Sequence, residues 1–338
     1  MPGYDVRIAP VCASAVRMPL ANSNGKASAT PSAERKSVVE LPRHVQHVSS
    51  LSNPYVKHLV KMRESSSYRE ATESVLVVGS NLLQELCEFA VTNNTEAAFE
   101  LEMLLVVEER DFPQELSTFS QRTVFLTASV MQKLAGLKSS ESVDAIGVVK
   151  LPSSFQKLSP DESLASAGAT LEKWCPNPHR LLILDGIQDP GNLGTLLRTA
   201  TAFAWDGVFL LPGCCDPFND KTLRASRAAN FRMPIAAGTW PQIQAFGKAN
   251  AMKFYAGIPE QVHSSRLHSK KNSPEALIEK IKSVKSLCLV LGSEGQGLSD
   301  PARRGSQHLT VPMPGKFESL NVAVVGGILM FLLMNKNI

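Results

Sequence analysis

The sequence predicts an α/β protein built from two domains, each with its own sheet. With 338 residues, the chain is long enough for about two domains with real cores. Short runs rich in Val, Ile and Leu alternate with helix-like segments in both halves, which is typical of α/β folds. A Ser- and Pro-rich stretch at residues 152–169 separates the halves. We therefore expect a small α/β sandwich, a linker at residues 151–177 and a larger α/β domain at residues 178–338.

Residues 1–45 show no sustained hydrophobic period and are rich in Ala, Ser, Pro and Arg. Acids are few in this segment: Asp5, Glu34 and Glu40. This composition favours an organellar transit peptide, for a chloroplast or a mitochondrion. The alternative is a disordered basic extension that assists binding to a nucleic acid.

Residues 48–150 are predicted to form the small α/β sandwich. Residues 50–62 indicate a turn and then a helix, with Val56 and Leu59 on its apolar side. The other side of this helix is basic, which fits a solvated face and a nucleic-acid-binding face equally: Lys57, His58, Lys61 and Arg63. Strands are expected at residues 74–78, 101–107, 123–126 and 145–151, and further helices at 81–90 and 129–137.

The larger domain is predicted to alternate strands and helices in the same way. Strands are expected at residues 181–184, 207–211, 252–256, 286–291 and 309–311, and helices at 193–203, 220–229 and 274–284. A final apolar helix reaches residue 334 and is expected to begin near Ser319, which is a suitable N-cap. Its apolar run is too short to span a membrane, so we expect a buried helix or one that packs against a partner subunit.

Three loops that follow predicted strands carry the unusual polar residues: residues 189–198, 292–299 and 312–321. Ligands of open α/β sheets collect outside the carboxyl ends of strands, so these loops are expected to converge. The glycine-rich loop at residues 292–297 lets a ligand approach the backbone closely. Its spacing does not fit a dinucleotide-binding loop, and the chain has no P-loop motif.

Charge and cysteine content limit the classes of partner and site. The net charge of +4 and the pI near 8.7 permit a polyanionic partner without demanding one. The six cysteines form no CxxC pair and have no accompanying histidine spacing, so neither a disulfide framework nor a metal site is expected. Cys214 and Cys215 are adjacent, which suits a redox pair or simply small loop residues.

The three loops also carry motifs that resemble a known family. They read Asp-Pro-Gly-Asn-Leu-Gly-x-x-x-Arg over residues 189–198, Leu-Gly-Ser-Glu-Gly-Gln-Gly-Leu over 291–298 and Val-Pro-Met-x-Gly-x-x-x-Ser-Leu-Asn-Val over 311–322. These segments resemble the signature motifs of the SpoU family, SPOUT-superfamily enzymes that methylate RNA ribose 2′-hydroxyls. Residues 48–150 resemble that family's substrate-binding domain, which has a ribosomal-protein-like fold. Two departures are Val77-Val78-Gly79 in place of Val-Glu-Gly, and Ala323 in place of a serine.

The resemblance implies a SPOUT domain whose C-terminal segment forms a deep trefoil knot. It also implies a homodimer, S-adenosylmethionine as methyl donor and an RNA substrate, with ribosomal RNA favoured by the extra N-terminal domain. The alternatives are a transfer-RNA 2′-O-methyltransferase and a catalytically inactive RNA-binding ribosome-assembly factor.

The resemblance also assigns roles to individual residues. Arg198 is the residue expected to activate the ribose hydroxyl, but arginine is always protonated, so we interpret it as a phosphate clamp and electrostatic stabiliser. Asn192 is expected to orient the ribose or brace Arg198, and Glu294 to pair with Arg198 or position its loop. Ser319 and Asn321 are expected to fix the site from the knot side.

Each of these residues also has an ordinary structural reading. Asn192 suits a turn or a helix cap, Ser319 a helix cap, and Glu294 a solvated loop acid. The methyl donor is expected to contact backbone groups and short apolar residues: Leu291, Gly292, Gly297, Val311, Met313 and Leu320.

Overall fold

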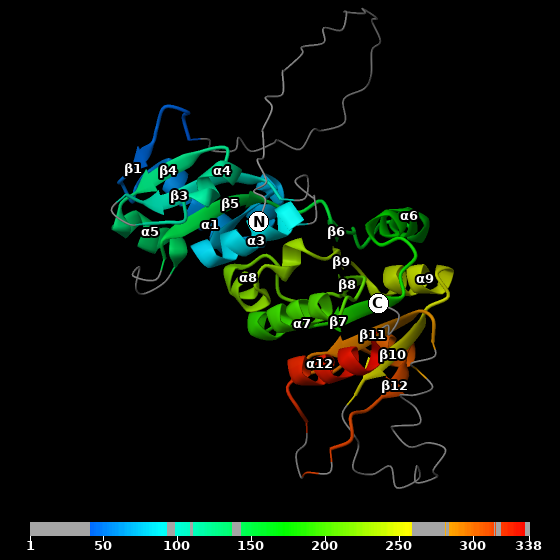
Figure 1. Cartoon of the computed structure of the whole chain (residues 1–338). Coiled ribbons are helices and arrows are strands. Elements are labelled where there is room, and N and C mark those ends of the chain that lie inside the picture. The colour runs from blue at the N-terminus through cyan, green and yellow to red at the C-terminus, as the bar shows by residue number, and fades with distance from the viewer. Residues whose placement is uncertain are drawn as a thin grey trace, which may run out of the picture. The chain divides into compact units, whose positions relative to one another are not determined.

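Two β-sheets, each covered by helices on both faces, form the framework of the computed structural model (Figure 1). The structure describes residues 41–92, 99–108, 111–136, 143–258, 281, 284–313, 315 and 319–334. Both sheets belong to one compact unit, Val39–Ile338. The predicted transit segment lies outside the described residues up to residue 40, and so does most of the predicted helix at 274–284.

The first sheet has five strands in the order β1-β4-β3-β5-β2. These are β1 (His47–Val48), β2 (Ser74–Val78), β3 (Leu101–Val107), β4 (Thr123–Leu126) and β5 (Ala145–Lys150). Helices α1 (Pro54–Glu64) and α5 (Ala128–Ala135) pack on one face, and α3 (Ser80–Thr92) and α4 (Glu115–Phe119) on the other. The short helix α2 (Ser66–Thr72) follows α1 directly. The α/β sandwich predicted for this region is therefore confirmed.

One residue of the predicted basic helix face is not on the surface. His58 is buried, and its Nδ1 lies 2.8 Å from the hydroxyl of Tyr68. Burial lowers the pKa of His58, which favours the neutral imidazole. His58 therefore belongs to the packing of α1 on α2, and the exposed basic face is smaller than the sequence indicated.

The second sheet has seven strands, all parallel, in the order β12-β10-β11-β7-β8-β9-β6. They are β6 (Phe155–Lys157), β7 (Arg180–Asp185), β8 (Gly207–Leu210), β9 (Ile235–Ala237), β10 (Lys253–Gly257), β11 (Leu287–Gly292) and β12 (Gln307–Leu309). Helices α7 (Pro190–Ala202) and α12 (Val322–Leu333) cover one face, and α6 (Leu164–Trp174) and α9 (Trp240–Ala249) the other. The remaining helices are α8 (Asp220–Ser226), the 3₁₀ turn η2 (Ala229–Phe231) and α11 (Asp300–Arg304).

Several predicted boundaries were wrong. The predicted linker contains β6, an edge strand of the second sheet, and α6, which packs against α9. The helix expected from residue 193 begins at Pro190, and the strand expected at 309–311 is β12, which ends at Leu309. The final helix begins at Val322 behind the N-cap Asn321, not at Ser319.

The strand order reverses between β7 and β11, which is where an open parallel sheet binds ligands. Strand β8 pairs with one side of β7, and β11, which comes later in the chain, pairs with the other side of β7. The loops after β7 and β11 therefore leave the same edge of the sheet as neighbours, as expected. None of the helices in the described part of the chain is both long and apolar enough to cross a membrane.

Gly194 allows α7 and α8 to pack in direct backbone contact. A Cβ at this position would lie 2.6 Å from the Cβ of Ala225, 2.7 Å from the carbonyl oxygen of Thr222 and 2.8 Å from the amide nitrogen of Ser226. Two of these three atoms are backbone and cannot move without shifting α8. The close approach fixes α8 relative to the helix that begins at the switch point.

We predict that Gly194→Ala lowers the free energy of unfolding by about 1–3 kcal/mol, because the added methyl overpacks a rigid contact. Gly168→Ala is the matched control, since it also lies inside a helix and a Cβ there meets nothing within 4 Å. Gly168→Ala is expected to raise the free energy of unfolding by about 0.5–1 kcal/mol, because alanine has less backbone freedom to lose on folding than glycine. Urea denaturation followed by circular dichroism measures both, and equal stability of the two variants would contradict the close contact.

Candidate active site

The loop after β7 enters α7 through a short, strongly capped turn. Asp189 is the N-cap, and its Oδ1 accepts a hydrogen bond of 2.8 Å from the backbone N–H of Asn192. Pro190 occupies the first helical turn, where its missing N–H costs nothing. Asn192 is therefore a helical residue of the first turn of α7, and its side chain is half-buried.

The N-terminus of α12 lies beside this turn. The side chain of Asn321 caps α12 by accepting from the backbone N–H groups of Ala323 at 2.8 Å and Val324 at 3.3 Å. Its Nδ2 donates to Oδ1 of Asn192 at 2.9 Å. One asparagine thus caps a helix and joins it to the helix that begins after β7.

Glu294, in the loop after β11, completes the network. Its Oε1 accepts from Nδ2 of Asn192 at 3.2 Å and from the backbone N–H of Val322 at 3.1 Å. The carboxylate therefore lies at the positive end of α12, where negative charge is stabilised. Three residues from three separate loops, Asn192, Glu294 and Asn321, meet in one hydrogen-bonded group, which we call the Asn–Glu–Asn network.

The glycine loop keeps its shape through backbone contacts. Ser293 and Gly297 exchange two backbone hydrogen bonds, of 3.1 and 2.9 Å. A Cβ on Gly292 would lie 2.4 Å from the backbone of Gly297, and Gly297 has a φ of +67°, so both positions favour glycine. Nothing lies within 4 Å of a Cβ on Gly295, so a ligand can reach the backbone there.

Arg198 and Ser319, the other two predicted catalytic residues, do not join the network. Arg198 is exposed, and among the described residues it has no hydrogen bond or ion pair. It lies six positions after Asn192, which places it about 120° around the helix from that residue. Ser319 is exposed and does not cap α12.

The residues expected to hold a methyl donor lie at the same edge of the sheet. Leu291 is 1% exposed and packs in the core, so only its backbone can face a ligand. Gly292, Gly297, Val311 and Met313 are half-buried, and Leu320 is exposed. The loop between Met313 and Ser319 lies outside the described residues apart from Gly315.

Asp185 is a structural residue of this edge that the sequence reasoning missed. It ends β7, is buried, and its Oδ2 accepts from the backbone N–H of Ser299 at 2.7 Å. This bond ties the end of the glycine loop to β7. An acid directly after a buried Leu-Leu-Ile-Leu run was the available signal, since a buried carboxylate needs partners.

The cysteine pair does not support redox chemistry. Burial raises the pKa of Cys214 to about 12 and that of Cys215 to about 11, so both thiols are protonated at neutral pH. The Sγ of Cys214 lies 3.3 Å from both the N–H of Ile187 and the carbonyl of Leu184, and so helps to hold the loop after β7. Within the described residues, no group of His, Cys, Asp and Glu side chains is arranged to hold a metal ion.

We predict that Asn321→Ala lowers the free energy of unfolding by about 1 kcal/mol, because it removes the cap of α12 and its bond to Asn192. Ser319→Ala, two residues earlier, is expected to change it by less than about 0.5 kcal/mol. Thermal unfolding of the two variants checks this pair. A larger effect at Ser319 would mean that the helix begins where the sequence first indicated.

Comparisons with known proteins agree with this geometry. Residues 179–331 match the model of the SpoU rRNA Methylase family. The chain is similar to the 23S rRNA (guanosine(2553)-2′-O)-methyltransferase RlmP of Bacillus subtilis, with 27% identity covering 85% of this chain and 98% of the relative. It is also similar to the mitochondrial rRNA methyltransferase 3A of Danio rerio, with 33% identity over 44% of this chain and 42% of the relative.

Solved structures show the same fold. The AdoMet-bound rRNA methyltransferase from Sinorhizobium meliloti superposes with a TM-score of 0.64 at 22% identity, over 87% of this chain and 99% of that chain. The three loops that form the Asn–Glu–Asn network all lie within the matched segment. Residues 179–331 of this chain therefore form a methylase domain of the SpoU family.

Proposed function

We propose that this protein is an S-adenosylmethionine-dependent RNA methyltransferase that acts on a ribose 2′-hydroxyl, with ribosomal RNA as substrate. The observation that carries the proposal is the Asn–Glu–Asn network, which joins all three motif loops at the switch point of a SpoU-type sheet. The similarity to RlmP extends over 85% of this chain, far beyond the methylase segment, which supports a ribosomal rather than a transfer RNA.

The residues fit a bound methyl donor. The open backbone at Gly295 and the half-buried Val311 and Met313 offer polar backbone groups beside apolar surface, which suits adenine and ribose. When bound, S-adenosylmethionine supplies an activated methyl group on a sulfonium, so the protein mainly has to orient donor and acceptor. We also expect the trefoil knot of this family, whose path would include residues outside the described ranges.

The chain's own polar groups set the position of the ribose. The second carboxylate oxygen of Glu294 is left to accept from a ribose hydroxyl, because Oε1 already serves Asn192 and Val322. The positively charged Arg198 clamps the adjoining phosphate and stabilises the hydroxyl oxygen as its proton passes to the second carboxylate oxygen of Glu294. Its exposure leaves the guanidinium open to RNA.

The first test is calorimetry of the full chain with S-adenosylmethionine. We expect saturable binding, and we expect Glu294→Ala to weaken it because the loop loses its anchors to α7 and α12. An RNA-binding assembly factor without catalytic activity need not bind the donor. Absence of binding by the wild-type chain would therefore favour that alternative.

The second test concerns Arg198. At saturating donor and RNA, we expect Arg198→Lys to slow methyl transfer roughly 10-fold, the loss of about 1.4 kcal/mol that a charge-assisted hydrogen bond represents. Arg304→Lys is the control, since Arg304 is exposed on α11 and, among the described residues, its ion pair is with Asp300. A full rate in Arg198→Lys would rule out a specific guanidinium role.

A second copy of the chain is the proposed partner of α12. The outer side of this helix presents an apolar stripe at i, i+4 and i+7: Val324, Ile328 and Phe331 are 51%, 36% and 54% exposed. Such a stripe is costly in water, and a homodimer would cover it.

We predict that Phe331→Asp shifts the protein toward monomers in analytical ultracentrifugation, because a buried unpaired charge disrupts an apolar interface. Val91→Asp is the control, since Val91 is 60% exposed on α3, away from the stripe. Unchanged mass for Phe331→Asp would exclude α12 as the interface.

An organellar location completes the proposal, supported by the basic, acid-poor composition of residues 1–45. Imaging a fluorescent protein fused to these residues tests the location. Mapping ribose methylation in organellar RNA with and without the protein then identifies the target nucleotide.

A further inference from the structure

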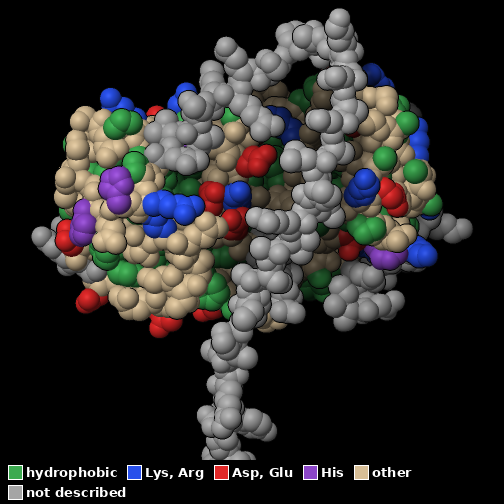
Figure 2. Space-filling model, turned by 90° about the horizontal axis from the view of Figure 1, so that it is seen from above, with side chains coloured by type: hydrophobic (Ala, Val, Ile, Leu, Met, Phe, Trp, Pro, Cys, Tyr) green, Lys and Arg blue, Asp and Glu red, His purple; other side chains and the backbone are tan. Residues whose placement is uncertain are grey.

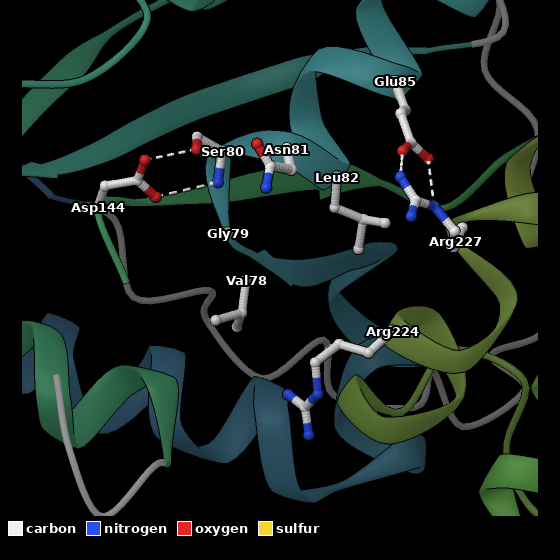
Figure 3. A pocket seen from close by; sticks show the side chains of 9 residues that line it. All are labelled: Val78, Gly79, Ser80, Asn81, Leu82, Glu85, Asp144, Arg224 and Arg227. Carbon is white, nitrogen blue, oxygen red and sulfur yellow. Dashed lines mark hydrogen bonds and ion pairs between the residues drawn. The ribbon is translucent and has the colours of Figure 1, made fainter. Parts of the chain in front are cut away.

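A cavity of about 370 Å³ lies between the N-terminal sheet and α8, away from the Asn–Glu–Asn network. One wall is the end of β2 and the first turns of α3, and the other is α8 (Figure 3). Its lining residues are Val78, Gly79, Ser80, Asn81, Leu82, Glu85, Asp144, Arg224 and Arg227. None of these residues belongs to the three motif loops.

Both carboxylates of the cavity are already engaged. Asp144 accepts from the backbone N–H of Ser80 at 3.2 Å and also from the Ser80 hydroxyl. Glu85 pairs with Arg227, whose Nε donates to Oε2 at 3.2 Å (Figure 3). Glu85 therefore neutralises Arg227, whereas Asp144 holds the first turn of α3 and keeps its negative charge.

Arg224 is the second cation of the lining, and its ion pair is with a carboxylate that does not line the cavity. It extends from α8 on the opposite side of the cavity from Asp144, Ser80 and Asn81 (Figure 3). This ion-pair partner is Asp220 on the same helix, at 2.9 Å, and the Arg224 side chain is 38% exposed. Partly exposed i,i+4 ion pairs on a helix are weak, so a stronger anion can replace Asp220.

The other donors face the same space. The exposed amide of Asn81 lies opposite Arg224 in the first turn of α3, whose first backbone N–H already donates to Asp144. Val78 contributes an uncharged, apolar side chain to the lining. A guanidinium facing an amide across a polar, open cavity suits a phosphate, which arginine binds in a two-pronged fashion.

The packing of α8 ties this cavity to the reaction site. Gly194 places α8 in backbone contact with α7, and α7 carries Asn192 in its first turn. Arg224 therefore sits at a fixed separation from the Asn–Glu–Asn network. A phosphate held by Arg224 would set which ribose along an RNA strand reaches that network.

We propose that the cavity between α3 and α8 binds a backbone phosphate of the RNA substrate, at a nucleotide other than the methylated one, with Arg224 as its main contact. The proposal rests on the proposed function for its RNA ligand. On the face shown in Figure 2, Lys and Arg side chains are interspersed with Asp and Glu rather than gathered in one basic field. Individual phosphate contacts of this kind would place a strand on such a mixed surface.

The test measures binding of a fluorescein-labelled single-stranded oligoribonucleotide of about 20 nucleotides to the full chain over a range of salt concentrations. We expect Arg224→Ala to raise the Kd roughly 5- to 10-fold and to reduce the salt dependence by about one phosphate contact. Lys221→Ala is the matched control, because Lys221 is exposed on the same helix but does not line the cavity. It is expected to change the Kd less than twofold.

A double-mutant cycle separates a specific contact from general charge. Asp220→Asn removes the competing carboxylate and is expected to tighten binding about twofold in the wild type, with no effect in Arg224→Ala. Equal losses for Arg224→Ala and Lys221→Ala, or additive effects of Asp220→Asn, would overturn the proposal. Circular dichroism confirms that each variant is folded.

The two proposals fail in distinguishable ways. If the chain binds no S-adenosylmethionine but Arg224→Ala still weakens RNA binding selectively, the proposed reaction is wrong and the phosphate site stands. If methyl transfer proceeds and Arg224→Ala binds RNA like the wild type, only the phosphate site is wrong.

Discussion

The carboxylate of Glu294 is the interaction on which the site depends. One of its oxygens accepts both from a side chain on α7 and from the first N–H of α12, so a single acid holds two helices that begin at the same edge of the sheet. Each helix start has a cap of its own, Asp189 on α7 and Asn321 on α12, so Glu294 fixes the two starts relative to each other. The geometry of the reaction site is thus a by-product of satisfying helix ends.

Small residues allow the helices to come close enough for this arrangement. Gly194 brings α8 onto α7, and Gly326 brings α12 onto α7, where a Cβ would lie 2.4 Å from the side chain of Leu196. The same face of the sheet therefore carries the reaction site, the apolar stripe of α12 and the wall with Arg224. These features share α7 as their common support.

Much of the fold was predictable, because its buried strands are runs of Val, Ile and Leu that end at turn residues. The convergence of the three loops followed from the topology of a parallel sheet and is confirmed for Asn192, Glu294 and Asn321.

Strand β6 was missed because three residues in a Ser- and Pro-rich stretch are too few to show a hydrophobic period. The cap of α12 was misplaced because Ser319 and Asn321 are both good caps, and only packing selects between them. Asn192 was expected to orient the ribose or brace Arg198, and the second role does not fit one helix because residues six apart do not share a face.

The edge strand β6 changes where the catalytic half of this protein begins. It pairs with β9, and α6 after it shields the hydrophobic cluster that contains Trp174, Phe209 and Phe246. A fragment that begins at residue 179 would lack β6 and α6. It would therefore expose the hydrophobic cluster and the unpaired edge of β9, and exposed strand edges promote aggregation. The segment that matches the family begins at residue 179, but the second sheet begins with β6. A fragment that folds on its own therefore has to start ahead of Phe155.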